Sequence, residues 1–334
     1  MIWYNDGGEN RDYILSTRVR FARNIVDYPF PSHLCPEVAA ELILRFEGAL
    51  GNEYKKISPE ELSSAELTAL LEKRLISPEF AKSNRRRALF LSEDERVSVM
   101  ACEEDHLRIQ SIVGGFDASK AYELALECEA KLEGSVSFAF DKKLGFLTQC
   151  PTNLGTGMRI SVMAFLPGLT YFKKMRHISE SLSKFGMTIR GVYGEGSESE
   201  ACIYQISNQV TLGFDESNLC DRLCEAVTAI ISQERQCRER MKGIETEDAV
   251  MRSLGALCYS RKMTCAEFER HYASIRLGIA LGYIDIPWAV CDRAYIEAQP
   301  SLIALGSKEK NIQNTPEERD ICRSAYLREV FSRR

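Results

Sequence analysis

Residue types suited to phosphate chemistry gather in one loop of the chain. The loop holds Cys150, Pro151 and two glycines, and it leads into Arg159 at the head of an alternating segment. An arginine in a half-buried strand is costly unless it meets an anion, and glycines let a ligand approach the backbone closely. The loop is therefore either one wall of a site that handles phosphate or an ordinary strand connection with a chance cysteine.

Arginines recur at other strands and loop ends, and two of these loops also carry glutamates. The five arginines are Arg18, Arg20, Arg108, Arg159 and Arg190. The planar guanidinium suits the bidentate recognition of phosphate oxygens. Each pattern also fits a solvated arginine on an edge strand, so the recurrence indicates a phosphate site more strongly than any single arginine does.

This inventory fits phosphoryl transfer to a guanidinium. The chain has no Walker loop, no complete dinucleotide fingerprint and no His-Arg-Asp loop. Several arginines with a magnesium ion could instead hold a nucleoside triphosphate. The acceptor guanidinium has a pKa of roughly 12.5 to 13.8, so one of its nitrogens must lose a proton before it can attack the phosphorus. Carboxylates can pair with the planar cation and accept that proton, and a cysteine thiolate would add a negative contact.

The composition limits the classes of protein that this chain can be. It has 334 residues, 45% of them hydrophobic, and a formal net charge of −5. That charge argues against general nucleic-acid binding. No apolar run has the length of a membrane span, and the first residues lack a signal-peptide pattern, so we expect a cytoplasmic protein. Its twelve cysteines are scattered, which favours reduced core residues over disulfides or a zinc site.

The elements that must position these groups follow from periodicity and turn residues. We expect extended segments at 13–24, 88–91, 96–102, 136–140, 146–148, 159–164, 187–192 and 203–208. We expect helices at 37–51, 60–75, 118–132 and 171–185, and then at 215–243, 246–259, 264–281 and 316–331. The change to a purely helical pattern predicts two domains, 1–238 and 239–334, and an α+β fold.

Three motifs resemble the signatures of the phosphagen (guanidino) kinase family. The loop from Cys150 to Arg159 is similar to the family signature, and 103–108 and 190–195 are similar to its two catalytic-glutamate motifs. The resemblance covers roughly residues 12 to 235. It implies a mainly antiparallel, glutamine-synthetase-like sheet flanked by helices, followed here by an all-α domain.

Two features resemble one branch of that family, the bacterial protein arginine kinases. The chain starts almost directly at the catalytic domain, and a helical domain follows it. Near the end, Arg319, Asp320, Arg323 and Ser324 resemble the branch's Arg-Asp-x-x-Arg-Ala motif, which helps to form a phosphoarginine docking pocket. The i, i+4 spacing places both arginines on one helix face, although such a pair is also typical of a solvated face.

The resemblance implies roles for particular residues. Glu104 and Glu195 bind the substrate guanidinium and serve as the base, and Cys150 contacts the same group. The implied ATP site comprises Ser16, Thr17, Arg18, Val19, Arg20, Arg74, Arg108, Arg159, Ile160, Ser161, Val162, Met163, Arg190, Gly191, Val192, Tyr193, Gly194 and Glu195. No residue is assigned to a metal. The chain departs from the family at Cys102, usually asparagine, at Arg74, which replaces a histidine near the nucleotide, and at Ser324, which replaces alanine.

The resemblance implies an ATP- and Mg²⁺-dependent kinase that phosphorylates arginine residues of proteins and marks them for a Clp-type protease. The implied partners are protein substrates, a small zinc-binding activator protein and a Clp-type ATPase, with a homodimer as the assembly. Two alternatives stay open at this point. A free-arginine kinase shares the chemistry and differs in substrate, and a phosphoarginine reader would use the C-terminal helices without turnover.

Overall fold

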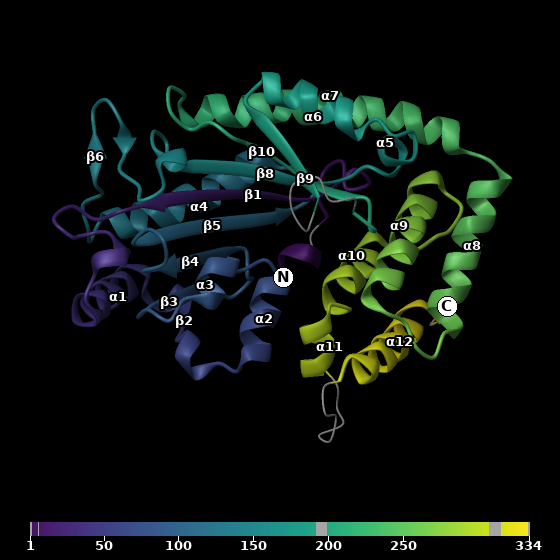
Figure 1. The fold of residues 1–334 in the computed structure, drawn as a ribbon, viewed down its shortest axis with the longest axis horizontal. Coiled ribbons are helices and arrows are strands. Elements are labelled where there is room, and N and C mark those ends of the chain that lie inside the picture. The colour runs from purple at the N-terminus through teal and green to yellow at the C-terminus, as the bar shows by residue number, and fades with distance from the viewer. Residues whose placement is uncertain (1, 6, 192–198, 307–314, 333–334) are drawn as a thin grey trace.

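An eight-stranded antiparallel sheet forms the centre of the protein in a computed structural model, which describes residues 2–5, 7–191, 199–306 and 315–332. The strand order is β2-β3-β4-β5-β1-β8-β10-β9 (Figure 1). The strands are β1 (Ile14–Arg23), β2 (Tyr54–Ile57), β3 (Ala88–Ser92), β4 (Val97–Ala101), β5 (Leu107–Gly114), β8 (Met158–Phe165), β9 (Met187–Gly191) and β10 (Ile203–Asn208). The predicted α+β class is confirmed.

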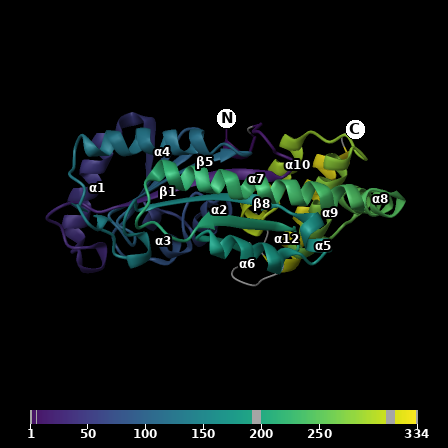
Figure 2. The ribbon, with the colours of Figure 1, turned by 90° about the horizontal axis from the view of Figure 1, so that it is seen from above.

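Helices flank this sheet and build the C-terminal third. The first group is α1 (Pro36–Leu50), α2 (Ser64–Glu72), α3 (Pro78–Lys82), α4 (Ala118–Glu133), α5 (Pro167–Tyr171), α6 (Met175–Lys184) and α7 (Glu216–Met241). The second group is α8 (Ile244–Tyr259), α9 (Cys265–Leu281), α10 (Trp288–Glu297), α11 (Pro300–Gly306) and α12 (Pro316–Ser332). Figure 2 shows α7 running from above the sheet to α8 and α9. Among the described helices, none is both long and apolar enough to cross a bilayer.

Several predicted elements differ from the structure. The helix expected at 60–75 begins only at Ser64, where Ser63 and Glu66 form a capping box. The helix expected at 171–185 begins only at Met175, as α6, because the separate helix α5 ends at Tyr171 and Lys173 between them has φ +55°. The hairpin expected at 136–148 is reduced to β6 (Phe140–Asp141) and β7 (Gly145–Phe146). Helices α10 and α11 were not predicted.

The two faces of the sheet differ in character because side chains alternate along each strand. On β1, Val19 and Phe21 enter a core that includes residues of α1, α4, α6 and α7. Arg18 and Arg20 lie on the opposite face and line a cavity. The sheet therefore has one face covered by helices and one that presents arginines.

The C-terminal helices share a core with the first part of the chain. Their joint apolar cluster includes Trp3, Phe165, Ile203, Phe268, Tyr272 and Tyr295. Ion pairs lie beside it: Arg11 Nε donates to Asp292 Oδ2 at 2.8 Å, and Arg276 also pairs with Asp292. The domain boundary predicted at 238/239 falls inside α7, which ends at Met241 before Gly243. The division into two domains stays a prediction.

Candidate active site

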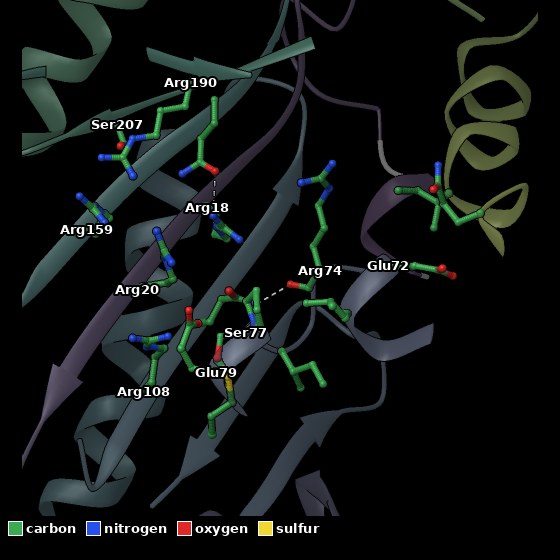
Figure 3. A pocket seen from close by; sticks show the side chains of 18 of the residues that line it. Arg18, Arg20, Glu72, Arg74, Ser77, Glu79, Arg108, Arg159, Arg190 and Ser207 are labelled. Atoms are coloured by element: carbon green, nitrogen blue, oxygen red, sulfur yellow. Dashed lines mark hydrogen bonds between the residues drawn. The ribbon is translucent and has the colours of Figure 1, made fainter. Parts of the chain in front are cut away.

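Five arginines converge on the sheet face that the flanking helices leave uncovered (Figure 3). Strand register brings them together. Arg20 on β1 lies directly opposite Arg159 on β8, and Ala22, the next residue on that face, lies opposite Arg108 on β5. Arg190 on β9 lies opposite Gln205 on β10. Like charges directly opposite each other destabilise a sheet, so the arrangement calls for an anion.

The electrostatics of these arginines point the same way. Burial, followed by the charges of Arg74, Arg108 and Arg159, lowers the pKa of Arg18 to about 9. Burial, followed by the charges of Arg18, Arg108 and Arg159, holds the pKa of Arg20 well below its usual range. The pKa of Arg159 falls through burial and through Arg190 and Arg108. A bound polyanion would relieve this mutual repulsion.

Arg18, Arg20 and Arg159 make few hydrogen bonds to the described part of the protein. Arg18 donates to Gln205 Oε1 at 3.3 Å, and Arg159 Nε donates to the Asn208 carbonyl at 3.3 Å. The Nε of Arg20 is buried and has no hydrogen-bond partner in the described part of the chain. A buried donor without a partner costs free energy, which a phosphate oxygen would recover.

Two cavities meet at these arginines. The larger, of about 590 Å³, is lined by Arg18, Arg74, Ser77 and residues of the C-terminal helices. The smaller, of about 140 Å³, is lined by Glu104, Cys150 and Asn153. Both cavities share Arg20, Arg108 and Arg159. A group held by these three side chains therefore faces both cavities.

Two neighbouring carboxylates orient Arg108. Its Nη1 lies 3.2 Å from Glu103, and its Nη2 donates to Glu104 Oε2 at 3.1 Å. The Glu103 side chain is 2% exposed, whereas that of Glu104 is 34% exposed. Glu103 also accepts a hydrogen bond from Ser77, and burial raises its pKa. Glu103 is thus an internal support, and Glu104 presents its carboxylate to the smaller cavity.

A tight turn between β4 and β5 sets the position of these carboxylates. Cys102 has φ +59°, and its N–H donates to the His106 carbonyl at 2.9 Å. Asparagine adopts that left-handed backbone more readily than most residues, which gives a physical reason for the family's usual asparagine here. Asp105 Oδ1 accepts from the Gln149 N–H at 2.8 Å. This bond joins the acidic turn to the loop that carries Cys150.

The loop that carries Cys150 packs against neighbouring segments of the chain. Cys150 Sγ lies 3.0 Å from Thr152 Oγ1, and the Thr211 hydroxyl donates to the Thr152 carbonyl at 3.0 Å. A Cβ on Gly155 would lie 2.4 Å from the Thr211 carbonyl oxygen, and one on Gly157 would lie 2.6 Å from Arg23 Nη1. The glycines therefore permit close packing of the chain on itself. Gly157 also lines the smaller cavity, so their role as room for a ligand stays a prediction.

Arg74 approaches the arginines from beyond the sheet (Figure 3). It follows α2 with φ +64°, and its carbonyl accepts from Gln110 Nε2 at 2.8 Å. Its side chain lines the larger cavity. The position that the resemblance assigned to the nucleotide thus faces the same space as Arg18 and Arg20.

The other predicted nucleotide residues divide by strand face. Ser161 and Met163 lie on the same face as Arg159, as Ser16 does with Arg18. Val19, Ile160 and Val162 belong to the core beneath the helices, and Thr17 Oγ1 donates to the Gly115 carbonyl on that side. Gly191 ends β9. Outside the described residues lie Val192, Tyr193, Gly194 and Glu195, the second predicted glutamate.

The predicted docking motif lies on α12, apart from the arginine face. Arg323 is 1% exposed, and it donates to the Ala298 carbonyl at 2.8 Å and to the Met263 carbonyl at 3.0 Å. It also pairs with Asp320 at 2.7 Å. Ser324 is buried and donates to the Ser260 carbonyl at 2.7 Å. Arg319 lies on the same helix. Arg323 here joins three segments of the helical region, and its docking role stays a prediction.

Several lining residues were missed by sequence reasoning. Gln205 and Ser207 stand at alternate positions of the predicted strand 203–208, so period-two alternation could have placed them. Ser77 is the N-cap of α3 and was not singled out. Tyr295 lies on α10, a helix without a sequence signal strong enough to predict it, and Gln299 lies between α10 and α11.

Metal-binding capacity can be judged from the donor set. Within the described ranges, no group of three or more His, Cys, Asp or Glu side chains could hold a metal ion. The larger cavity is lined mainly by arginines where the phosphates would lie. The described residues therefore do not hold a metal ion by themselves, and Mg²⁺ would have to enter the site with the nucleotide.

Two family models match successive parts of the chain. Residues 39–237 match the model described as ATP:guanido phosphotransferase, C-terminal catalytic domain. Residues 243–334 match that of the protein-arginine kinase McsB C-terminal domain.

Curated relatives match over nearly the whole chain. A protein-arginine kinase of Geobacillus stearothermophilus is 39% identical, over 98% of this chain and 92% of its own length. One of Caldanaerobacter subterraneus is 37% identical, over 95% and 96%. Among solved structures, the duplicated taurocyamine kinase of Schistosoma mansoni has a TM-score of 0.62 and 27% identity, over 78% of this chain and 38% of that one. Lombricine kinase, at 22% identity and a TM-score of 0.61, shares the fold.

Proposed function

The chain belongs to the ATP:guanido phosphotransferase family, and we propose that it transfers the γ-phosphoryl group of ATP to the guanidinium of arginine residues in proteins. The full-length similarity to proteins named protein-arginine kinase supports this acceptor. So does the match of residues 243–334 to the C-terminal domain of that kinase, because this match covers the helices that follow the catalytic domain.

The observation that carries the proposal is the meeting of two cavities at Arg20, Arg108 and Arg159. A γ-phosphate held there has the nucleotide in the larger cavity and the acceptor in the smaller one. The smaller cavity offers Glu104 and Cys150, a carboxylate and a thiol, to a planar cation. Exposed Thr152 stands at its rim, so an arginine side chain of another protein can enter from solvent.

The proposed step starts with the acceptor guanidinium paired to Glu104. A carboxylate accepts one N–H proton, the freed nitrogen forms a bond to the γ-phosphorus, and the bond from that phosphorus to the bridging oxygen of ADP breaks. Arg20, Arg108 and Arg159 face the charge on the equatorial oxygens. Glu195 is proposed as the second carboxylate. Positioning supplies most of the rate in such transfers. The hydrogen bond between Arg108 and Glu104 fixes the phosphate-binding group relative to the acceptor-binding group.

Magnesium completes the proposal. When bound with the nucleotide, the ion would neutralise part of the phosphate charge. The chain's own arginines then orient the phosphates, and Gln205 and Asn208 hold Arg18 and Arg159 in place.

The direct test offers the protein two acceptors. Mg-ATP is mixed either with an unfolded arginine-rich protein or with free arginine, and acid-labile phosphoarginine and ADP are measured. We expect phosphoarginine on the protein and little turnover of free arginine. The Glu104→Gln variant should remove turnover of both, and a substrate with lysine in place of arginine should stay unmodified. Preference for free arginine would favour the small-molecule kinase, and absence of turnover would favour the reader.

The remaining expectations belong to this proposal. Phosphorylation would mark proteins for a Clp-type protease in the cytoplasm, with a small zinc-binding activator, a Clp-type ATPase and a homodimer as partners. The motif of Arg319, Asp320, Arg323 and Ser324 would bind phosphoarginine. Binding of a phosphoarginine peptide to the wild type and to Arg319→Ala tests this last role.

A further inference from the structure

The larger cavity has a wall that belongs to the C-terminal helices. Glu269 of α9, Tyr295 and Ile296 of α10, and Gln299 line it opposite the sheet. Arg74 stands between this wall and the arginines of the sheet, as its side chain in Figure 3 shows. Burial raises the pKa of Tyr295 to about 12, and the neighbouring Arg74 guanidinium opposes that rise. Tyr295 and Arg74 are therefore close neighbours.

We propose that this wall, formed by Glu269, Tyr295 and Gln299, binds the purine base of the nucleotide and selects adenine. The proposal rests on the function proposed above, because it places the nucleotide in the larger cavity. It assigns to the C-terminal helices a part of the nucleotide site that the sequence motifs do not include.

The direction of the nucleotide follows from the two cavities. The transferred phosphoryl group must face Glu104 and Cys150 in the smaller cavity. The rest of the nucleotide then extends through the larger cavity, away from the acceptor. The lining combines arginines of the sheet with an aromatic ring, an amide and a carboxylate from the C-terminal helices and the residue that follows α10. Arginines match phosphates, whereas rings and amides match the face and edge of a base.

Contacts within the protein hold the wall rigidly. The Tyr295 ring stacks on Tyr272, with centroids 4.6 Å apart and planes 24° apart. The Tyr272 hydroxyl donates to Asp292 Oδ1 at 3.4 Å, and Arg276 donates to the Tyr272 hydroxyl at 3.2 Å. Arg11, which precedes β1, pairs with Asp292. A preorganised wall lowers the entropy cost of binding.

The polar atoms of the wall suit adenine better than guanine. Gln299 Nε2 donates to the Tyr295 carbonyl at 3.0 Å, which fixes the amide. Its Oε1 lies 3.8 Å from Cys265 Sγ, a weak contact that leaves acceptor capacity. Glu269 is 3% exposed. A carboxylate accepts from the exocyclic amine of adenine, but it would repel the carbonyl oxygen that guanine has at that position.

The test compares probes with and without a base on the full-length protein. Dissociation constants are measured by calorimetry for Mg-ATP, Mg-GTP and Mg-tripolyphosphate. We expect Gln299→Ala to weaken ATP binding about tenfold and to leave tripolyphosphate binding unchanged. Glu269→Gln should reduce the preference for ATP over GTP about tenfold. Arg270→Gln, exposed on the same helix and outside the cavity, serves as the matched control and should change neither.

The outcomes separate this inference from the proposed function. If wild-type protein neither binds ATP nor phosphorylates arginine, the proposed function fails. If it does both, but Gln299→Ala and Glu269→Gln leave the ATP and GTP constants unchanged, the C-terminal wall does not bind the base. An equal loss for ATP and tripolyphosphate in both variants would also overturn the inference, since it would indicate a general distortion of the cavity.

Discussion

Two arginines of strand β1 show how the faces of the sheet differ. Arg23, on the helix face, pairs with Glu129, donates to the Ala22 and Thr156 carbonyls at 2.9 Å each, and lies 3.5 Å from the centroid of the Phe146 ring. Arg20, three residues earlier, faces the cavity with a buried Nε that has no partner among the described residues. A buried arginine with its own partners stabilises the fold, whereas one without them indicates a ligand.

The largest expected effect is on catalysis. Arg20→Met should lower kcat/KM by on the order of 10⁴-fold, because an arginine that stabilises phosphoryl transfer has effects of that size. Initial rates of ADP release with a protein substrate measure it. Arg45→Met, at an exposed i, i+4 pair on α1, should leave the rate unchanged. A loss of kcat/KM of less than tenfold for Arg20→Met would contradict the claim that Arg20, unlike Arg23, binds the phosphate.

The partnered arginine should instead affect stability. Arg23→Met should lower the free energy of unfolding by about 3–5 kcal/mol, because Glu129 would remain buried without its partner. Urea denaturation followed by circular dichroism measures the change. The double variant Arg23→Met, Glu129→Leu should recover part of the loss. A single-variant loss below about 1 kcal/mol would show that the buried pair contributes little.

A second partnered group, His106, predicts how stability depends on pH. His106 Nδ1 accepts from the Ile25 N–H at 3.1 Å, its Nε2 donates to the Pro29 carbonyl at 3.0 Å, and burial lowers its pKa to about 4. Between pH 6.5 and 4 the unfolded chain therefore binds a proton that the folded chain does not. Stability present above pH 6.5 should fall by roughly 3 kcal/mol as the pH drops through this window.

Denaturation at several pH values between 4 and 7 tests this prediction. His106→Gln should flatten that part of the profile, whereas His177→Gln, at an exposed position of α6, should leave the profile as it is. An unchanged slope in His106→Gln would assign the acid sensitivity to other groups.

The smallest expected effect has the opposite sign to the others. Arg20→Met should raise the free energy of unfolding by about 1 kcal/mol, because it removes a cation whose buried Nε has no hydrogen-bond partner among the described residues. Thermal unfolding without nucleotide measures it. Mg-ATP at about 100 times its dissociation constant should stabilise the wild type by about 2.7 kcal/mol and the variant by much less. Destabilisation of the variant would mean that Arg20 has a structural role.

The sequence predicted most strands, and period-two alternation placed Arg18 and Arg20 on one face of β1. It did not predict β2 or β5, so alternation could not place Arg108, which lies on β5. It could not distinguish Arg23 from Arg20, since the partner Glu129 lies more than a hundred residues away. It also missed the break at Lys173 and the helix that presents Tyr295. Both depend on contacts between distant segments, which periodicity does not report.

The apolar cluster shared by the first segment and the C-terminal helices limits how the protein can be divided. A fragment that stops at residue 242 would leave Trp3 and Phe165 in water, and Arg11 would lose its carboxylate. Such a truncation would aggregate more readily than the whole chain, and so would its complement. When the two fragments are co-expressed, they should associate through this cluster and regain the solubility and activity of the whole chain.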